Sequence, residues 1–113
     1  MGGDHFISYP ILKAYRIKFG KPLALLQFDA HSDTWPDDDM DRIDHGTMFY
    51  KAVKQGLIDP KRSVQVGIRT HNSDTLGVNI IDTREVFEIG PSKTAKKIKS
   101  ILGDDPTYLT FDI

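Results

Sequence analysis

The stretch Leu23-Ala24-Leu25-Leu26-Gln27-Phe28, followed directly by Asp29-Ala30-His31-Ser32-Asp33, decides the fold. A short and almost continuously apolar run after Pro22 is typical of a strand that is covered on both faces, as in a parallel sheet. Polar residues begin where this strand ends. Because open α/β sheets bind ligands just outside the carboxyl ends of their strands, residues 29–33 stand where a functional site is expected.

Helices and strands alternate along the rest of the chain. Residues 8–19 carry an apolar helical stripe that includes Leu12, with Ser8 as a possible N-cap and Gly20 as the stop. Two crossover helices are expected at residues 47–55 and 91–102, and further strands at residues 63–68, 78–81 and 108–113. The acidic residues 30–44 show no period and predict a loop. This alternation predicts an α/β fold with a parallel sheet and crossover helices.

The 113 residues have room for one small domain or a part of one. The last apolar strand lacks a following helix that would cover the sheet, and so we expect the chain to be part of a larger domain. The composition is near the globular average, with 39% hydrophobic and 27% charged residues.

Charge and cysteine content exclude several classes of protein. Fifteen Lys and Arg residues against 16 Asp and Glu residues leave a net charge of −1, which argues against nucleic acid as a partner. No apolar run approaches the roughly 20 residues of a membrane helix, and the residues after Met1 do not resemble a secretory signal. The absence of Cys excludes disulfides and thiolate metal sites. We therefore expect a cytoplasmic protein without a membrane partner.

Asp29, His31 and Asp33 are potential metal ligands placed two residues apart. If the backbone stays extended, their side chains project on one side. Carboxylate and imidazole ligands without thiolate suit Mn²⁺ or a similar divalent ion, and carboxylates can bridge two ions about 3.5–4 Å apart. A polar loop after a strand is the structural alternative.

His5 and Asp112 extend this set of candidate ligands. Taken singly, His5 could be a cap partner near a helix start, and Asp112 could begin a turn at a strand end. Together with Asp29, His31 and Asp33 they fit one cluster better, because each lies where a parallel sheet opens its binding crevice.

Five motifs in this order resemble the ureohydrolase family of arginases and agmatinases, and most closely its bacterial agmatinases. The motifs are Gly3-Asp4-His5, Phe28 to Asp33, Asp44-His45-Gly46-Thr47-Met48-Phe49, Gly67-Ile68-Arg69, and Tyr108 to Ile113. The resemblance runs the whole length of the chain but covers only the middle third or so of such an enzyme. It implies a three-layer fold of the arginase and deacetylase type, with residues 1–113 as a central fragment of one catalytic domain.

The resemblance also implies the role of each candidate residue. Asp29 would bridge two manganese ions, with His5 and Asp33 on the first ion and His31 on the second. Asp112 resembles the other bridging carboxylate, and the family's last ligand falls one residue beyond the end of this sequence. His45 resembles the histidine that moves a proton to the departing amine, a role suited to its titration near neutrality. A cap or loop histidine is the alternative for His45.

The implied reaction is manganese-dependent hydrolysis of a guanidino substrate by a hydroxide held between two metal ions. Agmatine, hydrolysed to putrescine and urea, is the favoured substrate, so the partner is a small cation. Another ureohydrolase, such as an arginase or a guanidinobutyrase, is one alternative. A noncatalytic metal-binding fragment is another. The family assembles into trimers or hexamers, and a homo-oligomer is therefore expected of the complete enzyme.

Three further features stay open at the level of sequence. Trp35 could wall the substrate entrance or be a half-buried aromatic residue. The run Asp37-Asp38-Asp39 could attract a cationic substrate or be a solvated loop. We expect His71 to lie on the surface, and no residue is assigned to substrate binding.

Overall fold

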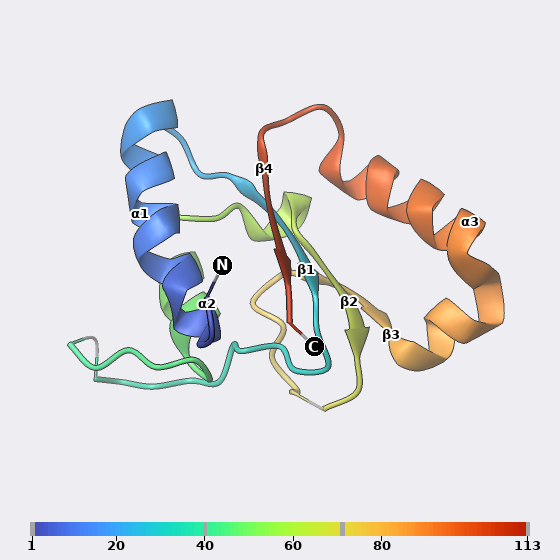
Figure 1. Ribbon diagram of the computed structural model, residues 1–113, viewed down its shortest axis with the longest axis horizontal. Coiled ribbons are helices and arrows are strands. Elements are labelled where there is room, and N and C mark those ends of the chain that lie inside the picture. Colours follow the sequence, from blue (N-terminus) through green and yellow to red (C-terminus); the bar gives the residue numbers. More distant parts are fainter. Residues whose placement is uncertain (1, 40, 71, 113) are drawn as a thin grey trace.

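A four-stranded parallel sheet runs through the computed structural model, which describes residues 2–39, 41–70 and 72–112 (Figure 1). The strands are β1 (Ala24–Phe28), β2 (Val64–Ile68), β3 (Asn79–Asp82) and β4 (Thr107–Phe111), in the order β3-β2-β1-β4. Strand β1 pairs in parallel with both β2 and β4. The expected parallel α/β fold is confirmed, and β1, the strand that directly precedes Asp29, lies inside the sheet. His71 and Ile113 lie outside the described residues.

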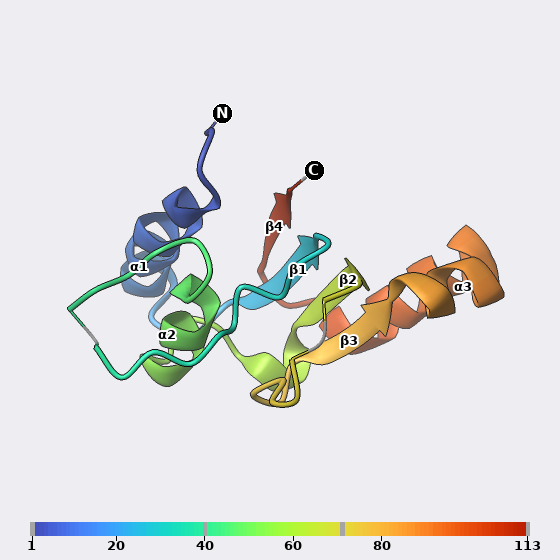
Figure 2. The same cartoon turned by 90° about the horizontal axis from the view of Figure 1, so that it is seen from below.

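Helices cover the two faces of the sheet and complete three layers (Figure 2). Helices α1 (Ser8–Phe19) and α2 (Met48–Lys54) lie on one side, and α3 (Thr83–Leu102) lies on the other. Two short 3-10 helices, η1 (His5–Ile7) and η2 (Pro60–Arg62), precede α1 and β2. This arrangement agrees with the expected crossover helices.

Successive residues of β1 face opposite layers. Leu25 is fully buried in a cluster with Leu12 of α1 and Phe49 of α2. Leu26 and Phe28 pack instead with β2 and the inner side of α3. Because both faces of this strand are covered, the apolar run is continuous rather than alternating.

Helix α1 has the expected bounds but a different start. Gly20 ends it in the left-handed region, at φ 69°, where its N–H donates to the Arg16 carbonyl. Ser8 as N-cap is wrong, because η1 runs directly into α1 and Ser8 is already helical. The side chain that caps this turn is Asp4, which accepts from the backbone N–H of Phe6. The Ser8 hydroxyl lies 3.1 Å from the hydroxyl of Tyr108.

Helix α3 starts earlier than the pattern predicts. It begins directly after β3, where the Asp82 side chain accepts from the N–H of Glu85. Gly90, at φ 78°, breaks it just before Pro91, so the expected helix over 91–102 is its second half. The described part of residues 30–44 forms neither helix nor strand, as expected. None of the helices in the described ranges is long and apolar enough to cross a membrane.

Candidate metal centre

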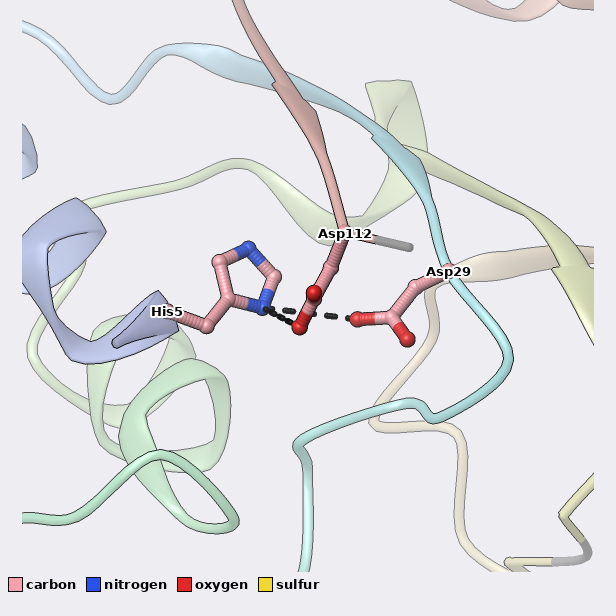
Figure 3. Close-up of side chains that lie close together, drawn as sticks. All are labelled: His5, Asp29 and Asp112. Atoms are coloured by element: carbon pink, nitrogen blue, oxygen red, sulfur yellow. Dashed lines mark ion pairs between the residues drawn. The ribbon is translucent and has the colours of Figure 1, made fainter. Parts of the chain in front are cut away.

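Three segments far apart in the sequence bring potential metal ligands together at the carboxyl ends of strands β1 and β4 (Figure 3). His5 comes from η1, Asp29 follows β1 and Asp112 follows β4. One ligand atom from each lies within 4.8 Å of the others. The parallel register explains why the two carboxylates meet. Phe28 pairs with Phe111, and the Asp112 N–H donates to the Phe28 carbonyl at 2.9 Å.

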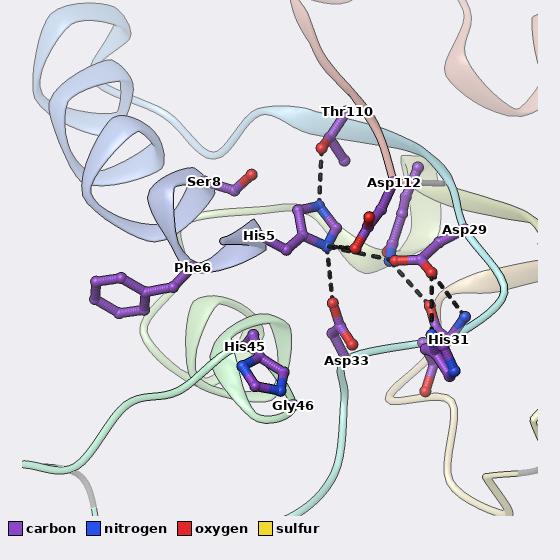
Figure 4. Close-up of polar contacts among 12 residues, drawn as sticks. His5, Phe6, Ser8, Asp29, His31, Asp33, His45, Gly46, Thr110 and Asp112 are labelled. Atoms are coloured by element: carbon purple, nitrogen blue, oxygen red, sulfur yellow. Dashed lines mark hydrogen bonds and ion pairs between the residues drawn. The ribbon is translucent and has the colours of Figure 1, made fainter. Parts of the chain in front are cut away.

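The His5 ring is held from both of its nitrogens (Figure 4). Its Nδ1 lies 2.8 Å from Asp33 Oδ2, 3.4 Å from Asp29 Oδ2 and 3.6 Å from Asp112 Oδ2. Its Nε2 lies 2.8 Å from the hydroxyl oxygen of Thr110. One nitrogen therefore faces a group of carboxylates, and the other is available to donate to a hydroxyl that fixes the ring.

The electrostatics of the cluster favour a cation among its carboxylates. Burial alone would lower the pKa of His5, but its interactions with Asp29 and Asp33 outweigh burial and raise the pKa to about 9. Burial would raise the pKa of Asp29, yet His5 and the N–H of His31 hold it below its ordinary value. Burial raises the pKa of Asp33, which the contact with His5 offsets only in part. Without a metal, the protonated imidazole of His5 is the cation.

The backbone conformation that brings Asp33 to His5 was not predicted from the sequence. The chain bends at Ala30 and His31, and Asp33 is in the left-handed region at φ 53°. The extended backbone that would place the side chains of Asp29, His31 and Asp33 on one side is therefore not present. Aspartate tolerates this conformation better than most residues. The N–H of Phe49 donates to the Asp33 carbonyl at 3.0 Å, and this bond holds the turn against the start of α2.

The two oxygens of Asp29 face different histidines. Oδ2 lies near His5 and accepts from the Gln27 amide at 2.8 Å. Oδ1 accepts from the N–H of His31 at 2.8 Å and lies 3.5 Å from the Nδ1 of the same residue. The His31 side chain is 60% exposed and is not among the three residues of the compact cluster.

His45 lies on the rim of the same site but apart from the carboxylates. Its side chain is 71% exposed, and its Nδ1 lies 3.8 Å from Asp4 Oδ2. The Asp44 carboxylate accepts from the N–H of Gly46 and holds the turn that presents His45. Asp4, His45 and Gly46 border a cavity of about 490 Å³ together with most of the candidate ligands. Its lining residues are Gly3, Asp4, His5, His31, Asp33, Trp35, His45, Gly46 and Asp112.

Sequence reasoning missed three polar residues that support the site. Gln27 and Gln65 are buried side by side, and the Gln65 amide donates to the Gln27 oxygen while Gln27 donates to Asp29. Thr110 contacts His5. All three stand in mainly apolar strands, and a polar residue in such a strand was the available signal.

The donor set fits a hard divalent cation. It consists of carboxylate oxygens and imidazole nitrogens, which suit Mn²⁺, and the nitrogen of His5 that faces away from the carboxylates has its own hydrogen-bond partner, as metal-binding histidines usually do. Such residues at the carboxyl ends of parallel strands are typical of metal-binding α/β proteins.

Comparison with known proteins assigns the chain to a family. It belongs to the arginase family, since the family model described as "Arginase family" matches residues 1–113. An agmatinase from Chromobacterium violaceum is 61% identical over 112 residues, which are 99% of this chain and 35% of that protein. A crystal structure of a hypothetical agmatinase from Burkholderia thailandensis matches with a TM-score of 0.95 at 62% identity, over 98% of this chain and 35% of that chain.

The likeness extends to more distant structures. A formiminoglutamase from Trypanosoma cruzi, solved with Mn²⁺, matches with a TM-score of 0.83 at 20% identity, over 98% of this chain and 40% of that chain. At this identity the match shows the fold alone. The chain spans about a third of the length of the Chromobacterium violaceum and Burkholderia thailandensis proteins.

Proposed function

We propose that this chain supplies most of a two-manganese centre in a ureohydrolase that converts agmatine and water to putrescine and urea. In this proposal residues 1–113 are a central part of one catalytic domain. The single observation that carries the proposal is the meeting of His5, Asp29 and Asp112 from three separate segments. The agmatinases among the similar proteins support the choice of substrate.

The candidate ligands form two groups, one for each proposed metal ion. In the proposal His5 and Asp33 would hold one ion and His31 the other, and Asp29 would serve both because its two oxygens face different histidines. Asp112 would be the second carboxylate shared by the two ions. Two divalent cations at this site would supply activation of a water molecule for attack on the guanidinium carbon.

Residues of this chain orient the metal ligands and supply a proton to the leaving group. Gln27 and the N–H of His31 fix the Asp29 carboxylate, and Thr110 fixes the ring of His5. His45 is exposed at the rim of the cavity, where it can give a proton to the departing amine.

Urea release tests the proposal. The chain is incubated with Mn²⁺ and either agmatine or L-arginine, with metal-free protein as the control. Metal-dependent urea from agmatine and not from L-arginine is the expected result. Urea from L-arginine and not from agmatine would show arginase activity instead of agmatinase activity. No urea from either substrate, with Mn²⁺ bound, would reduce the chain's role to metal binding.

A further inference from the structure

Lys51 in α2 is a lysine with no exposed surface, and it is not part of the metal cluster. Its ammonium group is directed at the segment of residues 35–44, which we call the acidic loop. It donates to the backbone carbonyls of Asp39 and Arg42, and it lies 3.3 Å from Asp37 Oδ2. An ammonium group without partners is costly to bury, and all three of these partners come from one loop. The contacts therefore hold the described part of the acidic loop against α2.

The base of the acidic loop is closed by backbone contacts. The N–H of Trp35 donates to the Gly46 carbonyl at 3.2 Å, so the loop leaves and returns at one place. Arg42 adds ion pairs with Asp37 at 3.6 Å and Asp44 at 3.7 Å, but its side chain is largely exposed and these pairs contribute little. Lys51 is consequently the buried anchor of the loop, and Trp35 is fixed at its base.

Trp35 presents an aromatic surface to the site. It is 46% exposed, which is unusual for the largest apolar side chain, and it lines the cavity that also contains His5, Asp33 and His45. The face of an indole ring attracts cations, and a guanidinium group is planar enough to stack on it. The carboxylates of Asp4, Asp33 and Asp112 line the same cavity and favour the same charge.

We propose that Trp35 is a specificity-determining residue that stacks on a cationic group of the substrate, and that Lys51 is the positioning residue that holds the acidic loop, and with it Trp35, in place. The identity of the cation as agmatine rests on the proposed function. The link between Lys51 and Trp35 does not.

Trp35 is the only tryptophan of the 113 residues, so its fluorescence reports on the acidic loop without metal or substrate. Lys51→Met removes the anchor, Asp37→Ala removes one partner from the loop side, and Lys54→Met is the control on the exposed side of the same helix. We expect red-shifted emission and at least about twofold stronger acrylamide quenching in Lys51→Met, a smaller change of the same sign in Asp37→Ala, and no change in Lys54→Met.

Circular dichroism accompanies each measurement. If Lys51→Met folds and its acrylamide quenching equals that of the original chain, the role of Lys51 is overturned. If Lys51→Met does not fold, Asp37→Ala decides, and unchanged quenching in that variant would overturn the role equally.

The contact with substrate is tested by titrating agmatine, with Mn²⁺ present, against neutral N-butylacetamide. Agmatine should change the fluorescence of Trp35 and N-butylacetamide should not. Trp35→Leu should raise the KM for agmatine about 2- to 30-fold, the range of a cation–π contact, and more than it lowers kcat.

The outcomes separate this inference from the proposed function. Urea release without a fluorescence response, and with an unchanged KM in Trp35→Leu, overturns the inference alone. A selective response to agmatine without urea supports the inference and contradicts the proposed function. If agmatine gives neither a fluorescence response nor urea, the proposed function and the contact between Trp35 and the substrate are both overturned, and the role of Lys51 is decided by the quenching experiment.

Discussion

Manganese binding to this chain should tighten by about 30-fold between about pH 6.5 and about pH 8. The Nδ1 of His5 that faces Asp29, Asp33 and Asp112 has to lose its proton before it can bind a metal. Because Asp29 and Asp33 raise the pKa of His5 to about 9 against the lowering effect of burial, the proton competes with the metal over this whole range. Below that pKa, the apparent affinity changes about tenfold per pH unit.

Isothermal titration calorimetry with Mn²⁺ at four pH values measures this slope. Repeating one titration in buffers of different ionisation enthalpy counts the released protons, and about one proton per chain is expected near pH 7. His45→Gln is the control, because His45 lies on the rim of the cavity and outside the cluster of His5, Asp29 and Asp112, and so the slope should not change. An affinity that is flat or falls with pH would refute the reasoning.

The metal-free chain should show the opposite trend. The pKa of His5 is raised from 6.5 to about 9 in the folded state, so its contribution to stability is fully present below pH 6.5 and is lost as the pH rises through about 9. Thermal unfolding without metal should therefore move to lower temperature over the range in which metal binding improves. Parallel trends would contradict the assignment of the proton to His5.

Other predictions concern single side chains. Asp29→Asn should weaken Mn²⁺ binding about 100-fold or more, whereas Asp38→Asn in the acidic loop should leave it unchanged; equal losses in a binding titration would show a general charge effect. Thr110→Val should weaken Mn²⁺ binding about 10- to 100-fold because His5 loses its partner, and Thr110→Ser should restore most of it. In the active protein His45→Gln should lower kcat about 10²- to 10⁴-fold with little effect on metal affinity, and a loss of bound manganese would mean that His45 is a ligand.

The fold could be predicted from the sequence because the pattern of apolar residues in each segment distinguishes a helix from a strand. A strand buried on both faces leaves a continuous apolar run, and the residue after it marks the edge where ligands bind. Asp29 could therefore be placed before its partners were known. His5 and Asp112 were harder, since each has an ordinary structural role when taken alone. Only the pairing of β4 with β1 and the position of η1 bring them to Asp29.

Other features depend on tertiary contacts that leave no local pattern. Asp33 turns through a left-handed conformation that a spacing of two residues does not encode. Lys51 looks like a surface lysine on a short helix, and only the returning acidic loop buries it. Gln27 and Thr110 interrupt apolar strands, but the sequence did not show that they point to the metal cluster.

Anomalous diffraction at the manganese edge from crystals grown with Mn²⁺ tests the central claim most directly. We predict one peak within bonding distance of His5 Nδ1 and the carboxylates of Asp29 and Asp112, and a second peak on the His31 side of Asp29. A map without a peak between His5 and Asp29, at a manganese concentration that saturates binding in solution, would contradict it.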